Sequence, residues 1–314
     1  MGRYLLRRAA TAVGVLWAAF TVSFVVLYLL PGDPIATMAS GGLDGEPLPP
    51  DQLAALRARY GFDQPVIVQY GQRLWAALSG DFGTSIQNGQ DVRAAILEAL
   101  PPTLQITLAG LVVAVLFGGT VALVGTYTRV PWLRQLLLAL PSLAVSLPVF
   151  WVGLLLVQVF AFGLGLLPSV GAGGPAALVL PAVTLGLPTG ALIAQVLAKS
   201  LSQALDDPYA VTARAKGVGR VDIHLRHALR NAALPALTVL AHVLGNLLAG
   251  SVVVETVFTR PGLGRLTVSA VGVQDIPVVQ GIVVFAAVVF VLVNLAVDLI
   301  YPLLDPRITT GATP

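Results

Sequence analysis

Long apolar stretches without a charged residue dominate the pattern of hydrophobic and polar positions along this chain. The longest holds 64 consecutive residues, 135–198, without Asp, Glu, Lys or Arg. Four more charge-free stretches lie at residues 9–32, 99–128, 231–254 and 276–297. A transmembrane helix needs about 20 apolar residues, so each of these four can cross a bilayer once and the longest can cross it twice. The pattern therefore predicts an all-α polytopic membrane protein with six transmembrane helices.

The predicted spans cover residues 9–30, 102–126, 136–162, 176–198, 234–257 and 278–302. The first could instead be a cleaved signal peptide, because Arg3, Arg7 and Arg8 precede it. Its apolar stretch exceeds the roughly 7–15 residues of a signal-peptide core, so we interpret it as a retained signal anchor. The remaining segments are a tail, a long connection, a membrane core and a second tail: residues 1–8, 31–100, 101–302 and 303–314.

The distribution of Lys and Arg predicts the orientation of the spans. With the N-terminus inside, twelve of the 18 Lys and Arg lie on inner segments and six on outer ones. Four of those six lie within residues 31–100, a long segment in which the charge rule is weak. Both termini and the loop 199–233 are therefore expected in the cytoplasm, with residues 31–100 outside.

The long outer segment carries turn signals but also signals for helix starts and ends. Three acidic residues can begin helices there: Asp51, Asp63 (followed by Pro65) and Asp91. Two glycines can end the first two helices: Gly61 and Gly80. Apolar anchors for the second helix are Val66, Tyr70 and Trp75. A partly helical, ordered cap is one interpretation, and a solvated spacer is the other.

The long inner loop, residues 199–233, predicts a helix, a glycine and a second helix. Asp207 precedes Pro208, which suits a first helical turn. The first helix would run over Tyr209–Lys216 and end at Gly217, which we expect at positive φ.

The faces of these two helices suggest a docking surface. Ala210 and Ala213 lie three residues apart and would share a smooth face, while Arg214 and Lys216 could pair with acidic groups of a partner or face water. The second helix has an apolar side and a basic side: Val221, Leu225, Ala228 and Leu229 against Arg226, His227 and Arg230. An amphipathic hairpin that faces lipid headgroups is the alternative.

Prolines and glycines predict two further features of the core. Two pairs of prolines, each seven residues apart, can kink the third and fourth spans: Pro141 with Pro148, and Pro181 with Pro188. Gly186 and Gly190 form a G-x-x-x-G pattern, which allows two helices to approach closely.

Composition excludes several classes of function. Only 11% of the residues are charged and 56% are hydrophobic, whereas soluble proteins have about 25% charged residues. The net charge of +3 is too small to suggest nucleic acid as a partner. There is no Cys, which excludes disulfides, thiol nucleophiles and cysteine-ligated metals.

Motifs for catalysis and nucleotide binding are also absent from the sequence. It contains no Gly-Lys dipeptide, so it cannot build a Walker A phosphate loop. His224 and His227 could face one metal, but without an acidic neighbour a solvated or lipid-facing pair is the favoured interpretation. We therefore predict no catalytic residue, no metal site and no cofactor bound by this chain.

Transport powered by a separate partner fits this pattern better than a membrane enzyme does. A proton-coupled carrier is a further alternative, but it usually needs ionisable residues within the bilayer. The candidates are few: His242, Glu255 and Asp298.

The inner loop identifies a family. The stretch D-D-P-Y-A-V-T-A-R-A-K-G-V at Asp206–Val218, followed by R-H-A-L-R-N-A-A-L-P up to Pro235, resembles the EAA loop of ABC importer permeases. The chain departs from that consensus at Val211, where the family has Glu, and at Thr212, where it has Ala. Further stretches are similar to the peptide branch, which includes nickel and glutathione relatives: L-P-G-D-P at 30–34, Y-G-F-D-Q-P-V-I-V-Q-Y at 60–70, S-G-D-F-G-T-S at 79–85, R-P-G-L-G-R-L at 260–266, Q-D-I-P-V-V-Q-G at 274–281 and D-P-R at 305–307.

The resemblance implies an assembly in a bacterial inner membrane. The expected fold is the type I ABC importer permease fold, and the long first outer segment favours the B-type half of a heterodimer with a second homologous permease. Two cytoplasmic ATPases, or one fused ATPase, would carry ATP and magnesium, and an external solute-binding protein would deliver a di- or oligopeptide, with nickel or glutathione as alternatives. Residues expected to contact the ATPase are Asp207, Tyr209, Ala210, Ala213, Arg214, Lys216 and Gly217.

The charge distribution yields a test of orientation in this Cys-free chain. Single cysteines at Ser40 and Ser202 would lie outside and inside the cell, respectively. A membrane-impermeant thiol reagent applied to intact cells should therefore label the Ser40→Cys variant and leave the Ser202→Cys variant unlabelled. The opposite labelling pattern would reverse the predicted orientation.

Overall fold

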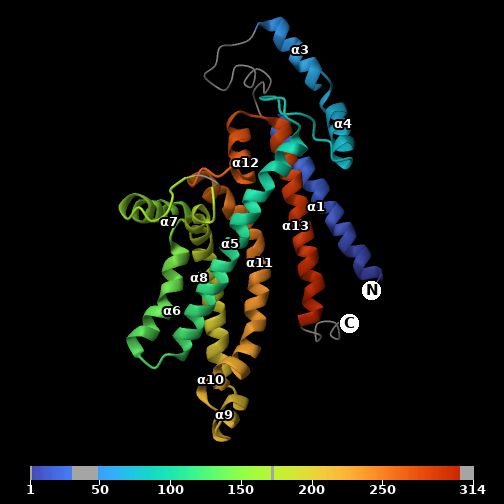
Figure 1. Ribbon diagram of the computed structural model, residues 1–314. Helices are drawn as coiled ribbons and strands as arrows, with labels where there is room; N and C mark the ends of the chain where they lie inside the picture. Colours follow the sequence, from blue (N-terminus) through green and yellow to red (C-terminus); the bar gives the residue numbers. More distant parts are fainter. Residues whose placement is uncertain (1, 30–48, 171–172, 305–314) are drawn as a thin grey trace. The chain divides into compact units, whose positions relative to one another are not determined.

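The computed structural model describes residues 2–29, 49–170 and 173–304 (Figure 1). Over these residues the chain is helical and has no β-strand, which confirms the predicted all-α membrane fold. The chain divides into two compact units: Met1–Pro101 together with Gly262–Pro314, and Pro102–Pro261. The long helix α5, Val92–Tyr127, contributes its first turns to the first unit and the rest to the second.

Among its described residues, the first unit contains five further helices: α1 (Gly2–Leu29), α3 (Pro50–Tyr60), α4 (Val66–Leu78), α12 (Leu263–Gly272) and α13 (Ile276–Leu304). Its core lies where the start of α5, α12 and α13 meet, around Val92, Ile96 and Ala270. Helix α13 comes so close to α5 that a Cβ at Gly281 would lie 2.6 Å from Val92 Cγ1.

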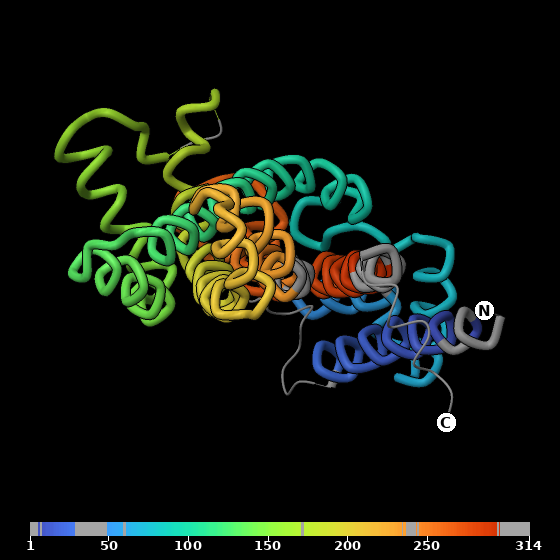
Figure 2. Tube along the Cα trace, turned by 90° about the horizontal axis from the view of Figure 1, so that it is seen from below, coloured from blue at the N-terminus to red at the C-terminus, as the bar shows by residue number. Residues whose placement is uncertain are grey.

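The second unit is built around α8, Ala176–Asp206, which packs against α6, α7 and α11. Its other elements are α6 (Pro131–Ser146), α7 (Val149–Leu156), the π-helix η1 (Val157–Gly163), α9 (Pro208–Ala215), α10 (Arg220–Asp222), the π-helix η2 (Ile223–Ala228) and α11 (Leu229–Val257). Figure 2 shows α8 and α11 side by side along their length.

Glycines hold α5 and α8 in backbone contact. A Cβ at Gly186 would lie 2.6 Å from the carbonyl oxygen of Gly110, and a Cβ at Gly190 would lie 2.7 Å from that of Ala114. One turn further along α5, a Cβ at Gly118 would collide with the carbonyl oxygen of Gly190. The predicted G-x-x-x-G pattern is therefore a helix contact, and its partner is a second row of small residues on α5.

All six predicted spans are helical, but the third is not one straight helix. By length and composition, four helical segments within the described part of the chain can cross a membrane: Arg8–Tyr28, Val92–Tyr127, Ala176–Asp206 and Ile276–Val293. A fifth span exists if Pro131–Ser146 and Val149–Gly163, which are bent by 106°, are counted as one. The fifth predicted span, residues 234–257, corresponds to α11, whose apolar stretch among the described side chains is Gly245–Val257.

Only one of the four core prolines interrupts a helix. Pro148 lies within the break between α6 and α7, which is the kink expected of it. Pro141, Pro181 and Pro188 lie inside continuous helices. The third span is therefore bent, whereas the fourth span contains two prolines and remains one continuous helix.

The predicted helices of the outer segment are present with shifted boundaries. Gly61 and Gly80 end α3 and α4 at φ values of 74° and 76°, as their sequence positions predict. Asp51 does not cap α3, because that helix already begins at Pro50 and places Asp51 in its first turn. Asp91 does cap a helix, since its Oδ1 accepts the N–H of Ala94 at 2.8 Å.

That third helix does not end before the membrane. It continues through Pro101 and Pro102 as α5, which has 36 residues and a length of about 54 Å. The hydrocarbon core is only about 30 Å thick, so α5 must extend beyond it. Helix α12 was not predicted from the sequence, although Leu263, Leu266 and Ala270 have helical spacing.

The α5–α8 contact can be tested with neighbouring glycines. Gly118→Ala adds one methyl group where the backbone of α8 leaves no space, and should destabilise the protein by about 1–3 kcal/mol. Gly119→Ala is the control, because a Cβ there meets nothing within 4 Å, and alanine favours a helix over glycine. Melting temperatures of the purified variants in detergent should therefore fall for Gly118→Ala only. Equal melting temperatures would contradict the close contact.

Candidate functional site

The inner loop forms a short helix, α9, that follows α8 after a single residue. That residue, Asp207, has extended backbone angles of φ −65° and ψ 149°. Its carbonyl oxygen accepts the N–H groups of Ala210 at 3.0 Å and Val211 at 3.3 Å. Its side chain forms no capping hydrogen bond, so the predicted cap acts through the backbone. Pro208 occupies the first helical position, as its sequence context predicts.

The end of α9 agrees with the predicted glycine stop. The helix ends at Ala215, and Gly217 follows at φ +82°, in the left-handed region that glycine adopts without strain. Gly217 N–H donates to the carbonyl oxygen of Arg214 at 3.0 Å, and Val218 N–H to that of Ala213 at 3.1 Å. These bonds fix the direction in which the chain leaves the helix.

The structure corrects which face of α9 a partner can reach. Ala210 is completely buried within the chain, and Ala213 and Tyr209 are half-buried, with Tyr209 packed against the core formed by α5, α8 and α11. The predicted Ala210–Ala213 face therefore points into this chain. The side opposite Ala210 exposes Pro208, Val211, Thr212 and Ala215, and Arg214 is exposed at its border.

A basic side chain ties α9 to α8. The guanidinium of Arg214 donates to the carbonyl oxygen of Leu205, near the C-terminus of α8, at 2.6 Å. A cation is stabilised at that position by the partial negative charge of a helix end. Lys216 is exposed at the end of α9.

The second predicted helix of the loop is partly a π-helix, whereas the sequence pattern predicted an α-helix. After α10, the chain forms the π-helix η2 and then runs directly into α11. The wider π turn shifts the buried side, so that Ile223, His224 and Ala228 are buried. Val221 and Leu225, which an α-helical pattern placed on the inner face, are exposed.

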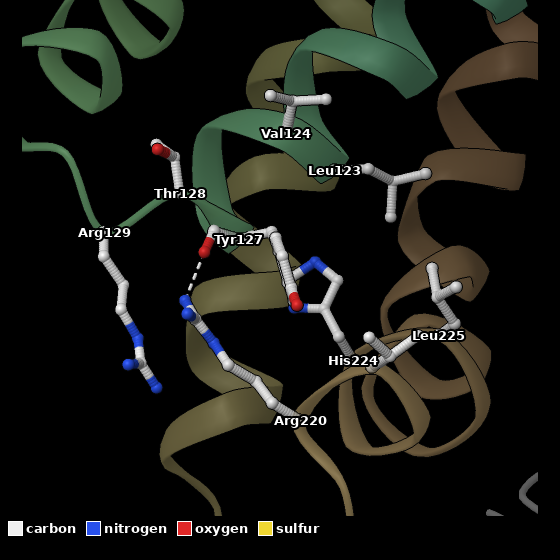
Figure 3. A pocket seen from close by; sticks show the side chains of 9 residues that line it. Leu123, Val124, Tyr127, Thr128, Arg129, Arg220, His224 and Leu225 are labelled. Atoms are coloured by element: carbon white, nitrogen blue, oxygen red, sulfur yellow. Dashed lines mark hydrogen bonds between the residues drawn. The ribbon is translucent and has the colours of Figure 1, made fainter.

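The start of this second segment is fastened to the end of α5 (Figure 3). The guanidinium of Arg220 donates a hydrogen bond to the carbonyl oxygen of Tyr127 and lies 4.4 Å from the centroid of its ring. Beside it, Nε2 of His224 lies 3.2 Å from Oγ1 of Thr126. Burial lowers the pKa of His224, and the charge of Arg220 acts in the same direction, so the imidazole is neutral at pH 7. The expected solvated or lipid-facing pair is therefore wrong for His224, which is buried.

A shallow cleft lies at this junction. Its walls are mainly apolar and it carries two guanidinium groups, those of Arg129 and Arg220 (Figure 3). It is lined by Leu123, Val124, Tyr127, Thr128, Arg129, Arg220, Val221, His224 and Leu225. No group of three metal-ligating side chains occurs among the described residues, and the cleft holds no pair of acid and base suited to catalysis.

A buried polar cluster lies in the same unit at the other end of α11. Glu255, which the sequence marked as ionisable, is fully buried and accepts the hydroxyl of Thr103 at 2.6 Å. Arg260 is also buried and donates to the carbonyl oxygen of Ala177 and to Oε1 of Gln105, both at 3.3 Å. Burial lowers the pKa of Arg260 and the nearby Glu255 charge opposes this shift. The cluster links α5, α8 and α11. The side chains of the other two candidates, His242 and Asp298, lie outside the described ones.

Two distant family motifs meet in the first unit. The hydroxyl of Ser85, in S-G-D-F-G-T-S, donates to Oδ2 of Asp275, in Q-D-I-P, at 2.5 Å. The N–H of Ile86 donates to Oδ1 of the same carboxylate at 3.3 Å. One carboxylate therefore holds the turn before α5 against the start of α13.

Comparison with known proteins assigns nearly the whole chain to one protein family. Residues 110–310 match the model of the binding-protein-dependent transport system inner membrane component, and residues 1–107 match its N-terminal model. A glutathione transport system permease protein of Salmonella typhimurium is 37% identical over 308 residues, covering 98% of this chain and 99% of the relative. A putative peptide transport system permease protein of Brucella suis is 36% identical over 316 residues, with the same coverage.

The chain belongs to this family and is an ABC importer permease of the peptide branch. The crystal structure of an amino acid ABC transporter shares the fold of the permease, with a TM-score of 0.51 and 19% identity over 68% of this chain and 94% of that chain. The all-α permease fold and the family inferred from the inner loop are thereby confirmed. The permease is not itself expected to be an enzyme, since its family is one of membrane components.

Proposed function

We propose that this permease forms half of the translocation path of an ATP-driven importer and that a cytoplasmic ATPase docks on α9. The observation that carries the proposal is the exposed face of α9, formed by Pro208, Val211, Thr212 and Ala215. This face contains no charged side chain and belongs to a helix that is fixed at both ends. A rigid helix with an uncharged exposed face of this kind can insert into a cleft of a partner protein.

The contacts around α9 provide a route from the ATPase to the membrane helices. The bond from Arg214 to Leu205 joins α9 to α8, and Gly217 sets the direction of the following segment. That segment is fastened to α5 through Arg220 and Tyr127. A movement of α9 would therefore be transmitted to α8 and α5, which are themselves joined by their glycine contact. ATP and magnesium would bind to the two ATPase subunits, or to one fused ATPase.

Membership of the family supports a proposal for the remaining parts of the assembly. We propose a bacterial inner membrane location with both termini and α9 in the cytoplasm. This permease would be the B-type half of a heterodimer with a second homologous permease. An external solute-binding protein would deliver the substrate on the opposite side of the membrane.

Short peptides are the solute that the relatives support best. One relative is named for peptide transport and another for glutathione, which is itself a tripeptide. Di- and oligopeptides are zwitterionic and cannot cross hydrocarbon unaided, because burial of unpaired charges is costly. Nickel or glutathione is the alternative within the same architecture. A proton-coupled carrier is less well supported, because Glu255 is buried and hydrogen-bonded at the end of α11.

The docking face can be tested by one added charge. Val211→Arg places a guanidinium in the proposed contact, and an unpaired charge buried there would cost about 3–5 kcal/mol of binding. The variant permease should insert normally but lose both co-purified ATPase and solute uptake. Val221→Arg is the matched control, because both valines are 53% exposed and Val221 lies in α10, outside the proposed contact. If the Val211 variant retains its ATPase and transport, α9 is not the docking site.

The solute can be tested by genetics in the source organism. A strain without this permease should lose uptake of radiolabelled di- or oligopeptides, and the wild-type gene should restore it. The Val211→Arg gene should fail to restore it, which would assign the loss to the contact between the permease and its ATPase. Normal peptide uptake combined with lost glutathione or nickel uptake would instead assign the alternative solute.

A further inference from the structure

One helix outside the predicted spans carries an apolar face that no described residue covers. On α4, Ile67, Trp75 and Leu78 are 80%, 77% and 76% exposed. Their spacing of eight and three residues places them on one side of the helix, together with Gly71. The charged residue of α4, Arg73, lies away from this side, where it interacts with Tyr28 of α1. The exposed side is therefore a continuous apolar stripe.

The opposite side of α4 is anchored to a membrane span. The hydroxyl groups of Tyr70 and Thr21 lie 2.9 Å apart, and the Tyr70 ring contacts those of Phe20 and Phe24 at centroid distances of 5.7 and 5.2 Å. The span of α1 covers Arg8–Tyr28, so Thr21 lies seven residues, about 10 Å, from its C-terminal end. Figure 1 shows α4 near that end of α1.

These contacts place α4 at the level of lipid. The neighbouring surface of α1 at this depth is formed by Val22, Val25 and Val26, which are also exposed and lie within the span. The apolar stripe of α4 therefore has the same apolar, exposed character as the neighbouring surface of the α1 span. A position in water would expose three large apolar side chains on a single short helix, which soluble surfaces avoid.

We propose that α4 is an interfacial helix, with its apolar stripe inserted among the lipid acyl chains of the leaflet at the C-terminal end of α1. Trp75 is a side chain typical of the boundary between headgroups and acyl chains. Amphipathic helices of this kind lie in the membrane plane with the apolar face buried about 5–10 Å below the headgroups. The segment between the first two spans then anchors part of the permease to lipid. This inference is independent of the solute and of the docking of an ATPase.

Collision measurements on spin labels test this placement. In the Cys-free chain, nitroxide labels are attached at Ile67→Cys or Leu78→Cys, and at Gln72→Cys as a control. Gln72 is exposed on the same helix, about 140° around the axis from Ile67. Each full-length variant is purified with the subunits that accompany it and reconstituted in vesicles of phosphatidylethanolamine and phosphatidylglycerol.

The two collision partners separate the outcomes. Labels at Ile67 and Leu78 should collide with oxygen, which concentrates in lipid, several-fold more often than the Gln72 label does. The same two labels should rarely collide with a water-soluble nickel chelate. Frequent collisions with the nickel chelate at all three positions would place the stripe in water. Immobile labels that collide with neither reagent would show that a protein subunit covers it. Either of these results would overturn the proposal.

Discussion

The architecture of the second unit depends on one contact, the backbone approach of α5 and α8. Lipid offers no hydrophobic driving force between apolar helices, so close packing has to supply the attraction. Gly110, Ala114 and Gly118 on one helix face Gly186 and Gly190 on the other, and a single methyl group would separate the two backbones. This contact lets α8 serve as the central helix against which α6, α7 and α11 pack.

The position of the inner loop depends on the contact between α5 and α8. Helix α9 is joined to α8 by Arg214, and the segment after it is joined to α5 by Arg220 and by His224. Because α5 and α8 are themselves held together, both attachments of the loop lead to one rigid pair of helices. A short helix of eight residues, which would be marginal in isolation, is therefore held in one orientation.

Polar contacts between distant segments complete the two units. Glu255, Thr103 and Arg260 join the ends of three helices in the second unit, and Asp275 holds the turn at Ser85 in the first. Buried charges are stable only when they are hydrogen-bonded and neutralised. Such clusters therefore fix which helix ends come together, and they account for ionisable residues near the spans without assigning them to a proton path.

The sequence by itself determined the six helical segments, the stops at Gly61, Gly80 and Gly217, and the family, because apolar length, left-handed glycines and local motifs depend on neighbouring residues. It predicted a proline kink in the third span but not its angle of 106°, and it could not determine the π turn that buries His224 or the partner row of the glycines at 186 and 190. It also placed Ala210 on the face expected to contact an ATPase, whereas the structure buries Ala210 and leaves Val211 exposed. These features were decided by the tertiary structure, since each depends on which side of a helix its neighbours in space already occupy.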